Sequence, residues 1–204
     1  MPTQPSYFAH LIVACLLHDI GYVRGILKGD GIDGYITDGK GGKTKLPRGS
    51  SDAALTPYHV DRSKLFVIDR ILEMGPLQAD RIASAIDYTR FSASHEPDDP
   101  PSEEGLLLRA ADLIGQLGDP HYFRKANALY QEFEEIGLNR QLGYTSPADI
   151  TDLYPQFYWK SVSLHIQDAI RYLNVTSSGR QWIASLYANV FRAERDLCLF
   201  GPQH

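Results

Sequence analysis

The chain has 204 residues, of which 43% are hydrophobic and 22% charged, and its net charge is −5. This length and composition are typical of a single soluble globular domain. The negative net charge argues against a general nucleic-acid or anionic-membrane binder. Cys15 and Cys198 are too few for a disulfide framework, and no apolar run reaches the roughly 18 residues of a membrane span, so we expect a cytoplasmic protein.

Hydrophobic periodicity predicts an all-α fold of about seven helices around one core. The first helix covers residues 6–17, and Gly21 has the position of a C-terminal stop. A Gly-rich polar stretch over residues 29–55 is expected to form a loop or flap insertion, with a small hairpin around residues 35–37. Thr56 followed by Pro57 then has the pattern of a helix N-cap and first helical residue.

Several further apolar segments with helical periodicity follow. They cover residues 57–74, 77–91, 106–117, 121–136, 155–173 and 179–197. We expect residues 1–204 to form one domain, in which residues 137–204 complete the helical bundle. Aromatic residues of this C-terminal part recur at helical spacings, which predicts core positions for Tyr154, Phe157, Tyr158, Trp159, Trp182 and Tyr187.

The first motif with chemical content is "LLHDIG", where an apolar helix meets His18 and Asp19. Burying such a pair is costly unless something compensates both polar groups. An imidazole nitrogen and a carboxylate from adjacent residues suit a divalent cation. Taken alone, the dipeptide favours another interpretation over a metal site, namely a His that caps a helix carbonyl beside a solvated Asp.

The second motif is "LLLRAADLIGQ", which contains Asp112 among apolar neighbours. An unpaired carboxylate is strongly disfavoured in such surroundings. Arg109 and Gln116 lie three residues before and four after it, on the same helix face. Two interpretations stay open: an internal ion pair between Asp112 and Arg109, and a metal carboxylate beside a phosphate-binding Arg.

Together the motifs resemble those of the HD-domain metal-dependent phosphohydrolases. The signature of that family is an isolated His, an HD dipeptide on the next helix and an Asp on a later helix. "LLHDIG" is similar to the middle element and "LLRAADLIGQ" to the last, and the resemblance covers the helical segments from Leu11 to about Phe133. It implies an HD-domain-like helical bundle, one or two divalent metal ions (Fe, Mn, Ni, Mg or Zn) and hydrolysis of a small-molecule phosphate ester of the nucleotide or cyclic-nucleotide class. We expect neither nucleic acid nor membrane as a partner, and a homo-oligomer stays open.

On this resemblance, His18, Asp19 and Asp112 hold the first metal. Asp19 then bridges to a second metal that is bound partly by His59, in "LTPYHVDRSK". The alternative for His59 is a capping or solvent-facing side chain at a helix start. A metal-activated water attacks phosphorus in this mechanism. From their positions we assign Asp19, Lys64 and Arg109 to catalysis, and Arg62, Thr89 and Gln116 to substrate binding.

The family's first His has one upstream candidate in this chain, His10. Eight residues along a continuous helix separate it from His18 by about 12 Å, whereas ligands lie about 2 Å from a shared metal. The two cannot share an ion, so we expect either an N-terminal fragment or a misassigned start. A site without this His would instead suit a catalytically incomplete sensor or interaction module. For the remaining ligand position, Asp87 and His95 compete.

Overall fold

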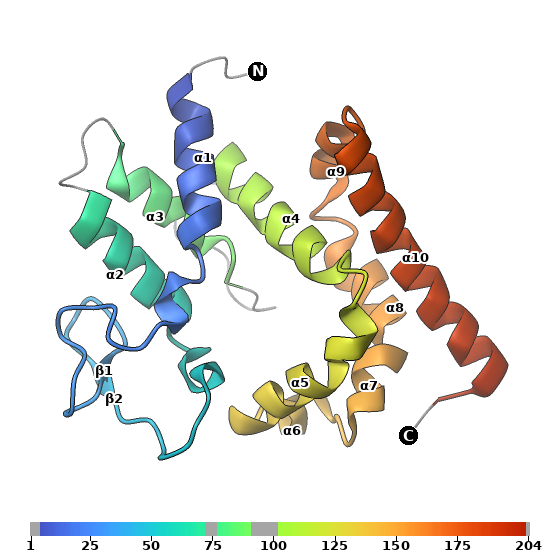
Figure 1. The fold of residues 1–204 in the computed structure, drawn as a ribbon, viewed down its shortest axis with the longest axis horizontal. Helices are drawn as coiled ribbons and strands as arrows, with labels where there is room; N and C mark the ends of the chain where they lie inside the picture. The colour runs from blue at the N-terminus through green and yellow to red at the C-terminus, as the bar shows by residue number, and fades with distance from the viewer. Residues whose placement is uncertain (1–4, 72–76, 91–101, 203–204) are drawn as a thin grey trace. The chain divides into compact units, whose positions relative to one another are not determined.

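The protein is mostly helical, which confirms the all-α prediction (Figure 1). The computed structural model describes residues 5–71, 77–90 and 102–202. Within these ranges, no helix combines the length and the apolar character needed to span a membrane. The chain divides into two compact units, Met1–Arg109 and Ala110–His204, and each is described by itself.

The first unit consists of helices, two 3₁₀ turns and one small hairpin. Its elements are α1 (Pro5–Leu17), the 3₁₀ turn η1 (Ile20–Tyr22), β1 (Tyr35–Ile36), β2 (Lys43–Thr44), the 3₁₀ turn η2 (Asp52–Leu55), α2 (His59–Ile71), α3 (Ala79–Asp87) and the beginning of α4 (Glu103–Leu117). The predicted helix end at Gly75–Pro76 lies outside the described residues.

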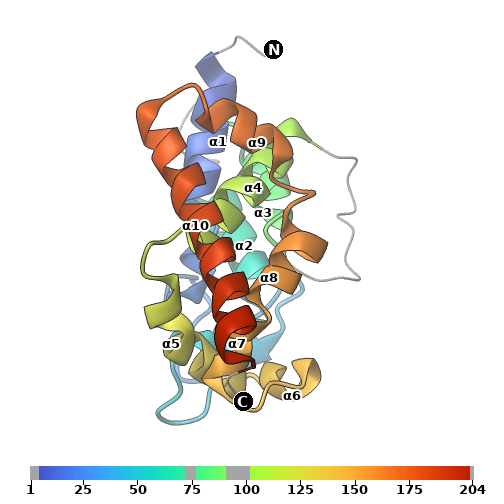
Figure 2. The same cartoon turned by 90° about the vertical axis from the view of Figure 1, so that its right-hand side faces the viewer.

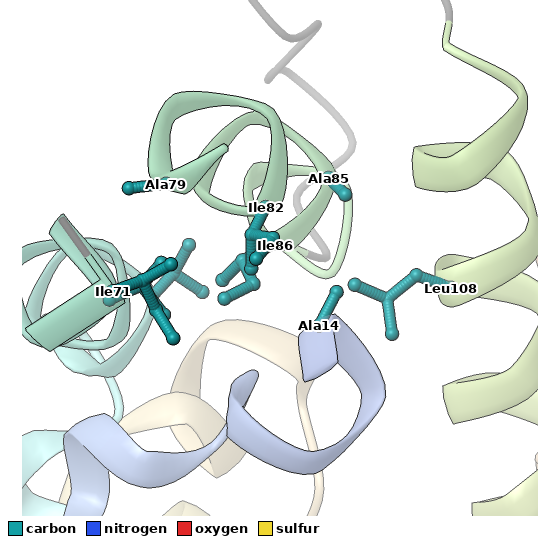
Figure 3. Close-up of a cluster of buried hydrophobic side chains, with 9 residues drawn as sticks. Ala14, Ile71, Ala79, Ile82, Ala85, Ile86 and Leu108 are labelled. Carbon is teal, nitrogen blue, oxygen red and sulfur yellow. The ribbon is translucent and has the colours of Figure 1, made fainter. Parts of the chain in front are cut away.

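The core of the first unit lies between α1, α2, α3 and the beginning of α4 (Figure 3). Ile82 and Ile86 of α3 are completely enclosed, because the i, i+4 spacing puts both on the face that packs against α1 and α2. The core members are Ala14, Val60, Val67, Ile71, Ala79, Ile82, Ala85, Ile86 and Leu108. The helical periodicity of the sequence thus predicted the buried faces of α2 and α3.

The hairpin expected within residues 29–55 is present and lies beside the start of α2 (Figure 1). Strands β1 and β2 pair antiparallel, with Tyr35 opposite Thr44 and Ile36 opposite Lys43. Asp38 closes the turn between them, because its carboxylate accepts backbone N–H groups of the turn. These hydrogen bonds hold the pKa of Asp38 below its usual value.

The helix expected to start at Thr56–Pro57 starts instead at His59. The preceding residues form η2, and its i→i−3 pattern continues until the N–H of Tyr58 bonds the carbonyl of Leu55 at 2.8 Å. The N–H of Arg62 then bonds the carbonyl of Tyr58 at 3.0 Å, which is an α-helical bond. A 3₁₀ turn therefore occupies the residues where the sequence indicated an N-cap.

The second unit contains the end of α4 and all later elements. These are α5 (Tyr122–Glu135), α6 (Leu138–Leu142), α7 (Pro147–Asp152), α8 (Tyr154–Phe157), the π-helical turn η3 (Tyr158–Val162), α9 (Gln167–Leu173) and α10 (Ser177–Phe200). The long helix α10 packs against α7, α8 and α9, as Figure 2 shows. The described ranges thus contain ten α-helices, where about seven were predicted.

The prediction of one helix over residues 155–173 is wrong. The N–H of Ser163 bonds the carbonyl of Tyr158 at 2.8 Å, five residues back, and the N–H of His165 bonds that of Val162 at 2.9 Å, three residues back. This change of hydrogen-bond register ends the helical segment. A new helix, α9, begins at Gln167.

The aromatic side chains of the second unit divide between core and surface. Tyr154 and Tyr158 are each 1% exposed, and the hydroxyl of Tyr154 donates to the carbonyl of Leu117 at 2.9 Å. Trp159 and Trp182, which were also predicted as core, are 49% and 40% exposed, so that prediction is wrong for them. Aromatic periodicity predicts a helix face, but an indole can lie at the exposed edge of that face, as Trp159 does while its N–H donates to Glu194 at 2.8 Å.

Candidate metal-binding site

Three polar side chains of the first unit meet where α1 ends and α2 begins. The Nε2 atom of His18 lies 3.3 Å from Oδ2 of Asp19, and the Nε2 atom of His59 lies 3.8 Å from Oδ1 of the same carboxylate. The imidazoles are 19% and 17% exposed, whereas the side chain of Asp19 is 56% exposed. In this His18–Asp19–His59 cluster, a solvent-facing carboxylate therefore contacts two largely buried imidazoles.

The backbone explains how residues 40 positions apart come together. The N–H of His18 bonds the carbonyl of Ala14 at 2.9 Å, so His18 continues the hydrogen-bond pattern of α1 past its last residue. Asp19 directly precedes η1, whose tight turn packs against α2. His59 is the first residue of α2, so its side chain projects from the end of the helix that η1 contacts.

Both imidazoles are oriented by a backbone carbonyl. The Nδ1 atom of His18 lies 2.9 Å from the carbonyl oxygen of Cys15, and that of His59 lies 2.6 Å from the carbonyl oxygen of Thr56. A carbonyl oxygen only accepts hydrogen bonds, so each bond requires Nδ1–H, and in the neutral ring the lone pair is then on Nε2. These bonds match the capping alternative considered for both residues. They leave Nε2 for a second partner, which is also how metal-ligating imidazoles are held.

Asp19 carries a negative charge at neutral pH. Burial raises the pKa of its carboxyl group, but the hydrogen bond with His18 and the positive charges of protonated His18 and His59 lower it. The net pKa lies below the usual value. An ionised carboxylate between two Nε2 atoms attracts a cation, whether that cation is a proton on the imidazoles or a metal.

Gly21 and Tyr22, which follow Asp19 closely, also contribute to this cluster, and the sequence did not predict that they would. The ring of Tyr22 stacks on that of His59, with the centroids 4.4 Å apart and an angle of 14° between the planes. A Cβ atom on Gly21 would lie 2.0 Å from the carbonyl oxygen of His59, so only glycine fits there. Gly21 was expected to stop α1, but α1 ends at Leu17, and Gly21 instead permits a close approach of η1 to α2.

Lys64 and Asp87 belong to a group of charged side chains between α2 and α3. The Nζ atom of Lys64 lies 2.8 Å from Oδ1 of Asp87, and Arg90 lies 3.4 Å from the same oxygen. Arg90 also pairs with Asp61 at 2.7 Å. Asp87 is buried and lies within ion-pair distance of both Lys64 and Arg90. His95, its competitor for a ligand position, lies outside the described residues.

Three residues assigned to catalysis or substrate binding lie at the end of α3 or on α4. The Nε atom of Arg109 donates to the carbonyl of Tyr88 at 2.6 Å, and its guanidinium lies 5.7 Å from the centre of the Tyr88 ring. Thr89 is buried, and its hydroxyl donates to the carbonyl of Ile86 at 2.8 Å. Gln116 is exposed on α4, in the second unit.

Arg62 is completely buried and holds Asp30, so it does not face a substrate as expected. Its N–H groups are occupied by the carboxylate and by backbone carbonyls. We therefore assign it a role within the fold. The sequence offered no sign of this, because an Arg in the first turn of a helix usually reaches solvent.

Asp112 lies in α4 and belongs to the second unit, whereas the His18–Asp19–His59 cluster belongs to the first. The geometry described for the first unit therefore does not include it. Over residues 5–71, 77–90 and 102–202, no group of three or more His, Cys, Asp or Glu side chains is already arranged to hold a metal ion.

His10 takes part in packing rather than in the cluster. It is 3% exposed, and its Nε2 atom accepts the backbone N–H of Gln78 at 2.9 Å. The helix α1 is continuous from Pro5 to Leu17. His10 and His18 are therefore separated along one helix and cannot share a metal ion. His10 thus joins α1 to the start of α3.

Fold and cluster together define a mostly helical protein with an ionised carboxylate between two oriented imidazoles. The chain belongs to the Npun_R2479-like family, whose model matches residues 3–196. No curated protein matches the chain, and no solved structure matches it. The family description names neither an activity nor an HD domain, so both stay proposals.

Proposed function

We propose that this protein is a metal-dependent phosphohydrolase whose divalent cation is held by His18, Asp19 and His59. One observation supports this most strongly: both imidazoles bond a backbone carbonyl through Nδ1 and face the same carboxylate with Nε2. A helix cap needs only the first of these contacts. The second, made twice to one carboxylate, provides two nitrogen donors and one oxygen donor of the kind that bind Zn, Mn, Fe or Ni.

Two of the three distances between the proposed ligands are close to those of a metal site. Ligands about 2.1 Å from one metal lie about 3 to 3.5 Å from each other in tetrahedral or octahedral geometry. The contact of 3.3 Å between His18 and Asp19 is within this range, and that of 3.8 Å between His59 and Asp19 is slightly longer. Asp19 is the exposed member of the cluster, so its side chain is the one free to adjust.

Asp112 is our candidate for a further ligand. The proposal for Asp112 comes from the HD-domain resemblance of "LLRAADLIGQ".

Hydrolysis needs an activated water and neutralised phosphate charge. When bound, a divalent ion lowers the pKa of water and polarises phosphoryl oxygens. In the hydrolysis, the oxygen of water would bond to phosphorus as the bond from phosphorus to the ester oxygen breaks, and the proton that water loses would go to the departing oxygen. We assign charge neutralisation of the phosphate to Arg109 and Lys64. The substrate class is a phosphate monoester or diester, with nucleotides included.

The test measures metal content and turnover on the same samples. The purified protein is equilibrated with Mn²⁺, Ni²⁺, Zn²⁺, Fe²⁺ or Mg²⁺, dialysed, analysed for bound metal and assayed with p-nitrophenyl phosphate and bis(p-nitrophenyl) phosphate. We expect stoichiometric metal and turnover, and loss of both in Asp19→Asn and His59→Gln. Asp33→Asn and His121→Gln, at exposed positions, are the matched controls and should change neither.

The outcomes separate the possible functions. Absence of stoichiometric metal in the wild type would overturn the proposal. An unchanged metal content in Asp112→Ala would remove Asp112 from the site and leave the cluster in place. Metal without turnover would instead support a catalytically incomplete sensor or interaction module.

A further inference from the structure

The side chain of Arg62 is a hub that joins α2 to the segment between η1 and the hairpin. It is 0% exposed, and so is the side chain of Asp30, with which it forms two parallel hydrogen bonds of 3.0 and 2.9 Å. Its remaining N–H groups donate to three backbone carbonyls, those of Gly21 at 2.6 Å, Ile36 at 2.6 Å and Val23 at 3.0 Å. All five N–H donors of the guanidinium are therefore used.

Asp30 extends this hub into the backbone of the insertion. Its carboxylate accepts the N–H groups of Ile36 at 2.9 Å, Gly25 at 3.1 Å and Leu27 at 3.4 Å. Residues 21–36 thus converge on one buried ion pair, although this segment contains little regular structure. A bidentate Arg–carboxylate pair has a fixed planar geometry, so it sets positions as well as charge.

The same hub reaches the His18–Asp19–His59 cluster through Gly21. Arg62 donates to the carbonyl of Gly21. The hydroxyl of Ser63, the next residue of α2, accepts the backbone N–H of Gly21 at 2.9 Å. Gly21 lies against the carbonyl of His59, and the following residue, Tyr22, stacks on the His59 ring. Gly21, two residues after Asp19, is therefore held at its carbonyl by Arg62 and at its N–H by Ser63.

We propose that Arg62 is a positioning residue of the His18–Asp19–His59 cluster, which couples the placement of Asp19 and Tyr22 against His59 to the Gly-rich insertion. It acts through Gly21 and does not touch the ligand site itself. Its expected effect on metal affinity rests on the proposed function, whereas its effect on His59 does not. Groups that hydrogen-bond a metal ligand directly typically change metal affinity about 10- to 100-fold when they are removed, and Arg62 acts one residue further away, so we expect an effect at the lower end of this range.

The test compares Arg62→Lys with Lys28→Met in the full chain. Lysine keeps the positive charge of Arg62 and loses the planar fork. Lys28 pairs with Asp69 at 2.8 Å and so joins the same segment to the same helix, but its side chain is 75% exposed. It is the matched control for an ion pair between these elements.

Two readouts are taken for each variant. In the metal-free protein, NMR records the His59 ring protons, which the stacked Tyr22 ring shifts upfield; the resonance is assigned by comparison with His59→Gln. Co²⁺ titration, followed by visible absorption, then gives the metal affinity. We expect Arg62→Lys to lose the ring-current shift of His59 and to bind Co²⁺ about tenfold or more weakly, and Lys28→Met to match the wild type in both.

A folded Arg62→Lys with an unchanged His59 shift would overturn the inference. If Arg62→Lys does not fold, Ser63→Ala decides, because it removes only the acceptor of the Gly21 N–H. An unmoved His59 resonance in that variant would equally overturn the inference. If the wild type binds no Co²⁺ while His59 moves in Arg62→Lys, the proposed metal function fails and the positioning role of Arg62 stands.

Discussion

Replacing Asp30 by Asn keeps the shape of a buried side chain and removes its charge. The carboxylate of Asp30 accepts two hydrogen bonds from Arg62 and three from backbone N–H groups, and both side chains of the pair are 0% exposed. An Asn side chain keeps one oxygen, but its amide group then faces N–H donors where the second oxygen was. The guanidinium of Arg62 stays buried without a counter-charge.

The expected magnitude follows from that geometry. Removing one partner of a buried ion pair costs about 3 to 5 kcal/mol, because the other charge is left uncompensated. Since a domain of this kind is stable by about 5 to 15 kcal/mol, the loss is a large part of the total. We expect the free energy of unfolding of Asp30→Asn to fall by about 3 to 5 kcal/mol at pH 7.

Urea unfolding followed by circular dichroism measures this loss. Asp33→Asn is the control, because Asp33 lies in the same insertion and is exposed, so its replacement should cost less than about 0.5 kcal/mol. A loss below about 1 kcal/mol in Asp30→Asn would refute the reasoning, because it would show that the buried charge needs no partner.

The pH dependence provides a second check on Asp30. Burial raises the pKa of its carboxyl group, but the hydrogen bonds and charge of Arg62 and the hydrogen bonds of the backbone N–H groups together lower it by more. The folded-state pKa therefore lies below the usual value. Its contribution to stability is therefore complete above the unfolded-state pKa of about 3.9 and is lost as the pH falls through the folded-state pKa. The stability difference between wild type and Asp30→Asn should shrink below about pH 4. A constant difference would contradict a charge-based origin.

Two further predictions concern packing and buried hydrogen bonds. Ile86→Ala should lower the free energy of unfolding by about 2 to 5 kcal/mol, because Ile86 is 0% exposed, whereas Ile32→Ala, at a fully exposed position, should change it by less than about 0.5 kcal/mol; equal losses in urea unfolding would refute the assigned core. Tyr154→Phe should cost only about 0.5 to 1.5 kcal/mol, because Asn189 also donates to the carbonyl of Leu117, at 2.8 Å. A loss of more than about 3 kcal/mol in thermal unfolding would show that the hydroxyl does more than share this acceptor.

Helical periodicity predicted most of the helices of this protein because it records which face of a helix is buried. Ile82 and Ile86 show this directly, since their spacing on α3 placed both in the core. The division of residues 155–173 was not predictable in the same way. The π-turn at Tyr158–Val162 depends on which carbonyl each N–H reaches, and apolar side chains continue across it without a break in pattern.

The candidate site was predictable only in part. His18 and Asp19 drew attention as polar neighbours at the end of an apolar helix, and the family resemblance pointed to His59. The contact of both imidazoles with one carboxylate is a tertiary feature that no local pattern contains. Tyr22 was missed because a Tyr after a glycine has no distinctive spacing, and its stacking depends on the 3₁₀ turn that carries it.

The insertion illustrates why composition predicts flexibility poorly. Asp30 and Asp33 both lie in "GDGIDG", a stretch whose glycines suggest a mobile loop. Asp33 is exposed, whereas Asp30 turns inward and binds the backbone on both sides of it and the buried Arg62. The glycines allow that inward turn, because Gly34 has a φ of 130° and a Cβ there would lie 2.7 Å from the carbonyl oxygen of Thr44. The glycines of this segment therefore allow a compact arrangement around the buried charge of Asp30. The difference in the free energy of unfolding between Asp30→Asn and Asp33→Asn measures how much that arrangement contributes to stability.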